Sequence, residues 1–188
     1  MKPSSALKPL FAGCCAALFC GCSLLSENAQ SPIEYYDLQV PNKLSSVPID
    51  VEPFGSFSGE RLRMAQRRDG TRIHGSDFHK WSQAPGSLLT RYLRLAYRNE
   101  PADDALKAGA PVTLRGEVLV FEADQGSAKL GVRYTLRRGH ASCTKTVLIQ
   151  EKIEGKGPQA FADAMSRAAD RFARLAAAEA AKFPAGRK

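Results

Sequence analysis

The chain has 188 residues, a formal net charge of +8 and five cysteines. This length fits one domain with a real hydrophobic core. Four of the cysteines lie within the first 22 residues, so Cys143 is the one thiol left for a folded domain, which excludes a framework of internal disulfides there.

The N-terminus has the three parts of a secretory signal peptide. Lys2 and Lys8 give it a positive start, and an uncharged run of thirteen mostly apolar or small residues then ends at Gly21, directly before Cys22. A membrane-spanning helix needs about 20 apolar residues, so this run is too short to be a transmembrane anchor. We therefore predict a cleaved signal peptide over residues 1–21.

The cysteine after the cleavage point makes this segment resemble the bacterial lipoprotein signal. In such signals the cysteine becomes the first residue of the mature chain and carries the acyl groups. Cys14 has too short an apolar stretch behind it, and Cys20 follows a bulky phenylalanine, whereas Cys22 follows the small Gly21. We expect palmitate-type acyl chains on Cys22, no other cofactor, and stable anchoring, since two or more chains hold a protein on a membrane. By resemblance, Ser23 predicts the outer membrane.

Cleavage leaves 167 residues (188 − 21) with a net charge of +6, because the removed segment carries two lysines and no acid. We expect no nucleic-acid partner for an exported chain, and the charge suits either an anionic membrane surface or simple solubility. Residues 22–32 are polar and predict a lipidated tether ahead of a domain over residues 33–184.

Short strands are predicted in the first part of this domain. β-Branched, aromatic or alternating residues mark 33–40, 47–51, 61–67 and 71–74, with Asp69-Gly70 as a turn and 54–59 as a loop. In the third of these strands, Leu62, Met64 and Gln66 are expected on one face, opposite Arg61, Arg63, Ala65 and Arg67.

A helix is predicted to follow Pro85 and Gly86, with Ser87 as its cap. Its apolar face is formed by residues at helical spacing, namely Leu88, Leu89, Tyr92, Leu95 and Ala96. Arg91, Arg94 and Arg98 occupy the other face.

A three-strand meander and a long helix complete the pattern. The strands cover 112–123, 128–137 and 142–153. The first alternates Val112, Leu114, Gly116, Val118 and Val120 against Arg115, Glu117, Leu119 and Phe121. The second alternates more cleanly, as antiparallel strands with one wet face do: one side carries Ala128, Leu130, Val132, Tyr134 and Leu136, and the other carries Lys129, Arg133 and Arg137. The helix covers 159–183, with a buried stripe of Phe161, Met165, Ala168, Phe172, Leu175 and Ala176. We expect an α+β two-layer sandwich, with a mostly antiparallel sheet of about five to six strands and two helices on one face.

Three short stretches together point to a family. They are Glu34-Tyr35-Tyr36-Asp37-Leu38 soon after the lipoprotein cysteine, His79-Lys80-Trp81-Ser82-Gln83-Ala84-Pro85 ahead of the first helix, and the strand Leu114 to Glu122. In this order the chain resembles the ABC-type transport auxiliary lipoprotein family, which includes the lipoprotein of the paraquat-inducible MCE intermembrane transport system. The resemblance covers nearly all of the mature chain.

The resemblance implies a non-catalytic auxiliary component of an MCE-type ABC system that moves lipid between the inner and outer membranes. Its expected partners are the membrane, an MCE-domain protein and the ABC permease and ATPase complex, and its place is the outer membrane, facing the periplasm. A lone small domain cannot enclose a conduit, which leaves room for a ring-like homo-oligomer. The alternatives are a monomeric periplasmic lipid-binding lipoprotein and an envelope-assembly lipoprotein.

The motif residues Tyr35, Tyr36, Leu38, Trp81 and Pro85 each have a structural and a docking interpretation. Tyr36 and Leu38 are expected to face the core and Tyr35 to face outward, where it either packs or docks a partner. Trp81 either staples the chain to the first helix at Leu88 or Leu89, or contacts lipid at a membrane rim. The arginines Arg61, Arg63, Arg67, Arg68, Arg91, Arg94 and Arg98 form either a solvated face or a surface for an acidic partner or lipid headgroups.

Catalytic and metal-binding patterns are missing from the sequence. His74, His79 and His140 show no paired ligand spacing. The stretch 55–59 has Phe57 where a lipase elbow needs its serine. No glycine-rich phosphate loop is present, and Cys143 is expected to be a small buried hydrophobe on a strand. We therefore expect neither an enzyme nor a metal site.

Overall fold

A computed structural model of the chain describes residues 32–42, 44, 48–57, 62–98 and 111–183. The predicted signal peptide, with Gly21 and Cys22, lies outside the described residues, and so does the predicted tether except for Pro32. Arg61 also lies outside them.

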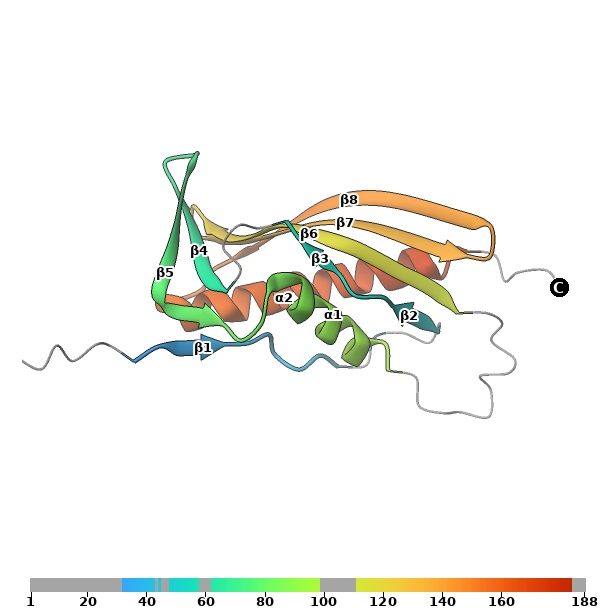
Figure 1. The fold of residues 1–188 in the computed structure, drawn as a ribbon, viewed down its shortest axis with the longest axis horizontal. Helices are drawn as coiled ribbons and strands as arrows, with labels where there is room; N and C mark the ends of the chain where they lie inside the picture. The colour runs from blue at the N-terminus through green and yellow to red at the C-terminus, as the bar shows by residue number, and fades with distance from the viewer. Residues whose placement is uncertain (1–31, 43, 45–47, 58–61, 99–110, 184–188) are drawn as a thin grey trace, which may run out of the picture. The chain divides into compact units, whose positions relative to one another are not determined.

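The described residues form one mixed sheet and two helices (Figure 1). The sheet order is β1-β5-β4-β6-β7-β8, and β2 and β3 pair separately with β6. The strands are β1 Glu34–Tyr36, β2 Ile49–Val51, β3 Gly55–Ser56, β4 Arg63–Arg68, β5 Arg72–Trp81, β6 Val112–Asp124, β7 Ser127–Arg138 and β8 Ala141–Lys152; the helices are α1 Pro85–Ala96 and α2 Gly157–Ala180.

The meander β6-β7-β8 and the long helix α2 form the centre of the domain. All three strands pair antiparallel, and the inward side chains of β7 (Ala128, Leu130, Val132, Tyr134 and Leu136) are fully buried, as their alternation predicts. Helix α2 has 24 residues, so it is roughly 36 Å long, and it runs along the inner face of β7 and β8 (Figure 1). The α+β class with a helix-covered sheet is confirmed.

The sheet contains more parallel pairing than expected. β1 runs parallel to β5, and β2, β3 and β4 run parallel to β6. Parallel neighbours need a crossover connection. Here β5 and α1 carry the chain from the end of β4 to the start of β6, so these two strands lie side by side in the same direction.

Several strands differ in length from their predictions. The strand expected over 33–40 ends at Tyr36, because the chain then turns to α2, where the Gln39 amide donates a hydrogen bond to Ser166 Oγ (3.0 Å). The strand expected over 71–74 continues to Trp81 through residues without an alternating pattern. Within the predicted loop 54–59, the two residues of β3 pair with β6.

Two irregularities of strand pairing overturn the predicted facing of side chains. Between Arg63 and Ala65, Met64 of β4 stands opposite four residues of β5 (76–79), and Met64 and Ala65 are both buried while Gln66 is exposed, where the alternation placed Gln66 with Met64. In β6 the register shifts between Val118 and Val120. A bulge adds one residue to one strand, and every later side chain changes face.

The bulge in β6 brings Phe121 into the core. The predicted alternation placed Phe121 opposite Val118, but both are buried. The bulge therefore lets β6 contribute both residues, together with Ala123, to the same apolar interior.

Helix α1 starts earlier than predicted. Its N-cap is Ala84 and Pro85 is in the first turn, where the missing amide hydrogen is no cost, so Ser87 lies inside the helix and does not cap it. The predicted apolar face is buried except for Leu95, which is half-buried, and Leu93 joins it. Arg91 and Arg94 are on the exposed face of α1, as predicted, and Arg98, which is also exposed, lies just beyond the end of the helix.

Candidate functional site

Two of the three sequence motifs meet at one edge of the sheet. β1 lies parallel to the end of β5, with Tyr35 opposite Lys80 and Tyr36 opposite Trp81. Tyr35 is 63% exposed, Tyr36 is half-buried, and Leu38 is buried just beyond the strand. Tyr35 is therefore accessible to a partner, while Tyr36 and Leu38 hold the same segment against the core.

Trp81 is the residue that joins this edge to the rest of the core. Its side chain is 0% exposed, and its ring stands edge-on to Phe121 of β6 (centroids 5.0 Å apart) and to Phe161 of α2 (5.5 Å). A side chain with no exposed surface does not contact a membrane rim in this conformation. Pro85, a few residues later, is buried in the first turn of α1.

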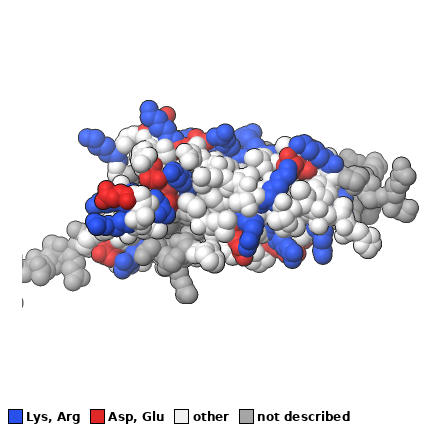
Figure 2. All heavy atoms as spheres, turned by 90° about the horizontal axis from the view of Figure 1, so that it is seen from above, with Lys and Arg blue, Asp and Glu red and all other residues white. Residues whose placement is uncertain are grey.

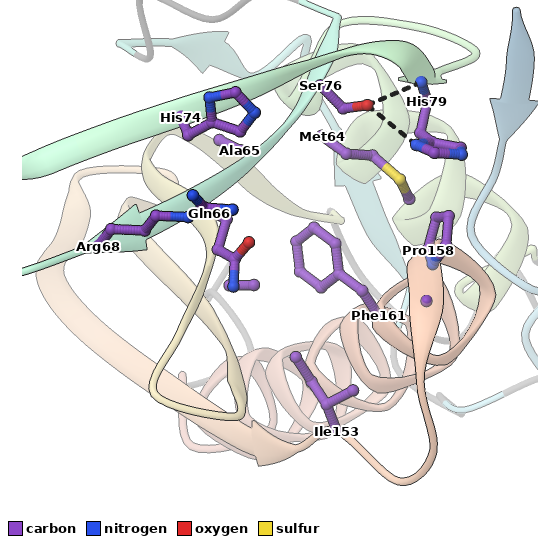
Figure 3. A pocket seen from close by; sticks show the side chains of 12 residues that line it. Met64, Ala65, Gln66, Arg68, His74, Ser76, His79, Ile153, Pro158 and Phe161 are labelled. Atoms are coloured by element: carbon purple, nitrogen blue, oxygen red, sulfur yellow. Dashed lines mark hydrogen bonds between the residues drawn. The ribbon is translucent and has the colours of Figure 1, made fainter. Parts of the chain in front are cut away.

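A pocket opens beside this joint, between the β4–β5 hairpin and the first turn of α2 (Figure 3). Its volume is about 390 Å³. The lining combines apolar side chains, among them Met64, Ile153, Pro158 and Phe161, with the polar side chains Gln66, Arg68, His74, Ser76 and His79. No local sequence pattern predicts this pocket, because its walls come from β4, β5, β6 and the start of α2.

Hydrogen bonds fix one corner of the pocket (Figure 3). Ser76 Oγ accepts a hydrogen bond from the His79 amide (3.0 Å) and lies 2.9 Å from His79 Nδ1. His79 Nε2 lies 3.8 Å from a Glu34 carboxylate oxygen, which also accepts a hydrogen bond from the Tyr36 hydroxyl. That hydrogen bond raises the pKa of Tyr36. The polar chain therefore links β1 to the pocket wall.

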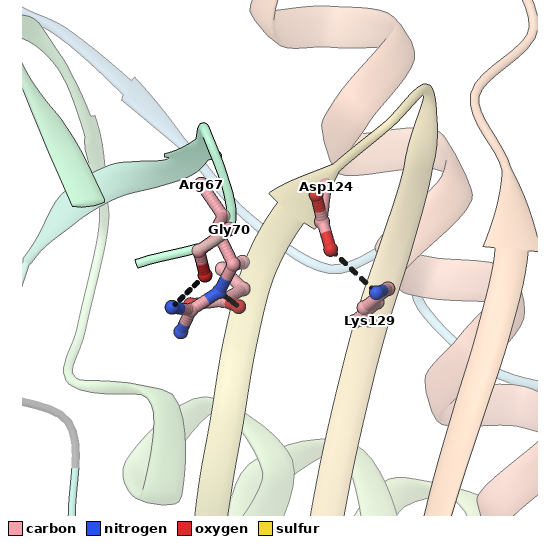
Figure 4. A network of polar contacts seen from close by, with 5 residues as sticks. Arg67, Gly70, Asp124 and Lys129 are labelled. Carbon is pink, nitrogen blue, oxygen red and sulfur yellow. Dashed lines mark hydrogen bonds and ion pairs between the residues drawn. The ribbon is translucent and has the colours of Figure 1, made fainter. Parts of the chain in front are cut away.

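A partly buried ion pair fixes the hairpin to the sheet behind the pocket (Figure 4). Arg67 donates to both carboxylate oxygens of Glu122 (2.5 and 3.0 Å), and it also donates to the Gly70 carbonyl (3.1 Å). Glu122 is only 7% exposed, so it depends on this partner. Next to it, Lys129 and Asp124 pair at 2.5 Å across β6 and β7.

The predicted arginine surface is divided among separate structural contacts. Arg91 pairs with Asp37, Arg94 donates two hydrogen bonds to the Val51 carbonyl (3.1 and 3.0 Å), and Arg67 holds Glu122. Figure 2 shows Lys and Arg side chains interspersed with acidic ones on the face that it displays. This pattern favours the solvated-face interpretation over a single basic docking patch.

Near the end of helix α2, one glutamate pairs with two lysines. Glu179 accepts hydrogen bonds from Lys145 of β8 (2.6 Å) and Lys182 (2.7 Å). These two hydrogen bonds lower the pKa of the Glu179 carboxyl to about 2.

The described residues contain no group of three His, Cys, Asp or Glu side chains that could hold a metal ion. Within the same ranges, no helix is long and apolar enough to cross a membrane. Cys143 lies half-buried on β8 as a free thiol.

Among solved structures, two similar folds are informative. One is described as an uncharacterized protein, with a TM-score of 0.64 and 12% sequence identity, covering 79% of this chain and 98% of its own. The other is protein XCC0632 from Xanthomonas campestris, a DUF330 protein, with a TM-score of 0.55 and 19% identity, covering 77% and 91%. At these identities the likeness establishes the fold alone.

No curated protein matches the sequence. The family model for the ABC-type transport auxiliary lipoprotein component matches residues 60–177, from just before β4 into α2, and so includes Trp81, Pro85 and the whole meander. The chain therefore belongs to the family of ABC-type transport auxiliary lipoprotein components.

Proposed function

We propose that this protein is an outer-membrane-anchored periplasmic lipoprotein and a non-catalytic auxiliary component of an MCE-type ABC lipid transport system. The match of residues 60–177 to the transport auxiliary family carries the proposal. The partners it implies are an MCE-domain protein and the ABC permease with its ATPase.

The anchor in this proposal is the set of acyl chains on Cys22, exposed by cleavage after Gly21. Residues 1–21 are then the signal, 22–32 the tether and 33–184 the domain. Ten residues lie between Cys22 and Ile33, so the eleven steps along the chain allow the domain to stand at most about 40 Å from the membrane. Ser23 supports sorting to the outer membrane, and no cofactor besides the acyl chains is required.

The sheet edge at β1 and β5 is the docking surface in this proposal. Its exposed apolar residues are Ile33, Tyr35 and Phe78. Ile33 and Phe78 each lie one residue before Glu34 and His79, which form the first pair between the two parallel strands. Exposed aromatic side chains on a rigid strand supply contact area at low entropic cost.

In the same proposal this protein catalyses no reaction. The transport energy comes from ATP, which the ATPase subunit hydrolyses. The auxiliary protein then needs only to position its partners, and the motif residues Tyr36, Leu38, Trp81 and Pro85 serve to hold the docking surface in shape.

Co-isolation tests this function directly. The tagged full-length protein, cross-linked in cells and purified, is expected to recover an MCE-domain protein and an ABC permease. Tyr35→Ala should lower that recovery severalfold. Leu148→Ala, which removes an exposed apolar side chain at the opposite edge of the sheet, should leave it unchanged. Recovery of neither partner contradicts the proposal.

A second candidate is a monomeric lipoprotein that holds a lipid in its own pocket, and the hollow beside Phe161 favours it. Native mass spectrometry separates the two. A monomer supports the second candidate, whereas a homo-oligomer, with or without bound lipid, supports a conduit component.

A further inference from the structure

We infer that the pocket between the β4–β5 hairpin and α2 binds one acyl chain of an anionic amphiphile, whose carboxylate or phosphate head lies against Arg68 and His74. The inference deepens the proposed function by naming a ligand class, and it rests on that function only for the source of the ligand. The binding itself depends on the geometry of the pocket.

The inner part of the pocket is suited to an alkyl chain. Met64 and Phe161 form its back, with the Phe161 ring turned into the space, and Ile153 and Pro158 flank them (Figure 3). Its volume of about 390 Å³ lies within the range of small-molecule sites, which are mostly apolar with a few polar groups. An acyl chain placed here removes apolar surface from water on both partners.

The outer part of the pocket is suited to a negative charge. None of the lining side chains is acidic, whereas Arg68, His74 and Gln66 supply hydrogen-bond donors. Arg68 is exposed at the rim, so a headgroup beside it stays partly hydrated and avoids the cost of a buried charge. The first turn of α2, which also carries no acidic residue, adds a partial positive charge at Gly157.

The two ends of the pocket give the ligand a direction. Figure 3 shows Arg68, His74 and Gln66 on one side, and Met64, Phe161 and Pro158 toward the other, where Ser76 and His79 also lie and are hydrogen-bonded to each other. The head therefore faces the hairpin and the tail points under it toward Trp81, whose ring lies against Phe161. Lipids with a neutral head gain the same apolar contacts but no charge pairing.

Trp81 provides a built-in reporter, since it is the single tryptophan of the sequence, is fully buried and contacts the pocket wall. The full-length acylated protein in phosphatidylcholine nanodiscs is titrated with 9,10-dibromostearate, whose bromines quench nearby tryptophan. A brominated lysophosphatidate and a brominated monoacylglycerol are titrated in parallel. We expect saturable quenching by the anionic probes and at least tenfold weaker binding of the neutral one. Preference for the first or second probe assigns a free fatty acid or a phosphate headgroup.

Three variants at exposed positions complete the test. Gln66→Phe fills the pocket and should abolish quenching. Arg68→Glu should weaken anionic binding at least fivefold. Arg137→Glu makes the same charge change on β7, away from the pocket, and should have no effect. Far-UV circular dichroism verifies the fold of each variant.

Two results overturn the inference: no quenching by either anionic probe, or equal quenching by all three probes that survives Gln66→Phe, which means partition into the bilayer. Failure of co-isolation with transporter subunits does not alter the quenching result, so the two proposals fail separately.

Discussion

Replacing Trp81 by alanine should remove a large part of the stability of the domain. A buried aromatic side chain removes about 150–250 Å² from water, and at about 25 cal/mol per Å² this is worth about 4–6 kcal/mol before the methyl group of alanine is credited. Measured tryptophan-to-alanine losses in cores are about 3–5 kcal/mol. Trp81 also gives up edge-on contacts with Phe121 and Phe161, so the upper half of that range is expected.

Urea unfolding followed by far-UV circular dichroism measures this loss without needing the tryptophan. With a slope of about 2 kcal/mol per molar urea, a loss of about 4 kcal/mol lowers the midpoint by about 2 M. Trp81→Phe should lose only about 1–2 kcal/mol, because Nε1 has no acceptor among the described residues and no hydrogen bond is broken.

Tyr35→Ala is the matched control for this experiment. Tyr35 lies beside the same end of β5 but is largely exposed, so the change should stay within about 0.5 kcal/mol. A loss below about 1 kcal/mol for Trp81→Ala would refute the view that this side chain joins the sheet edge to α2.

Three further changes probe other contacts. Arg67→Met should cost about 2–3 kcal/mol by stranding the Glu122 carboxylate, and adding Glu122→Gln should restore part of it; additive losses in a urea double-mutant cycle would contradict this coupling. Glu179, with its pKa lowered to about 2 by the two lysines, stabilises the fold above about pH 4.5, and that stability is lost as the pH falls toward 2. Glu179→Gln should therefore flatten the fall of the urea midpoint in this window; an unchanged profile would contradict the assignment. Gly86→Ala places a methyl group 2.4 Å from the Phe54 carbonyl oxygen and should cost about 1–3 kcal/mol by thermal or urea unfolding. Gly55→Ala, where the nearest atom is 3.5 Å away, should be nearly neutral, and equal effects of the two would argue against this close approach.

The parts of the fold that the sequence predicts well are those with a regular period. β7 has one wet and one buried face, so its alternation identifies both the strand and its inward residues. The buried apolar stripe of α2 is predicted equally well, since Phe161, Met165 and Phe172 recur at helical spacing and are all buried.

The parts that the sequence predicts poorly depend on local register or on distant partners. The bulge in β6 turns Phe121 inward, and the alternation of residues along this strand does not predict a bulge. The second half of β5 has no alternation of apolar and polar residues, so it has no strand pattern and gains its pairing from β1 and β4. The pocket was not predictable because its walls come from distant parts of the chain. β4 and β5 form one side of it, and α2, which follows much later in the sequence, forms the other.

The acylation site belongs to a different class of prediction. The processing machinery reads a signal peptide as a short linear pattern, so the argument for Cys22 needs only the residues next to it. Cys20 is the nearest rival, two residues earlier, and differs by the bulky Phe19 before it.

Labelling cells with palmitate, followed by membrane fractionation, tests the lipoprotein assignment most directly. The wild-type chain and Cys20→Ser are expected to carry label and to stay in the membrane fraction after a carbonate wash. Cys22→Ser should carry no label and should leave the membrane. Retained label and membrane association in Cys22→Ser would contradict the account.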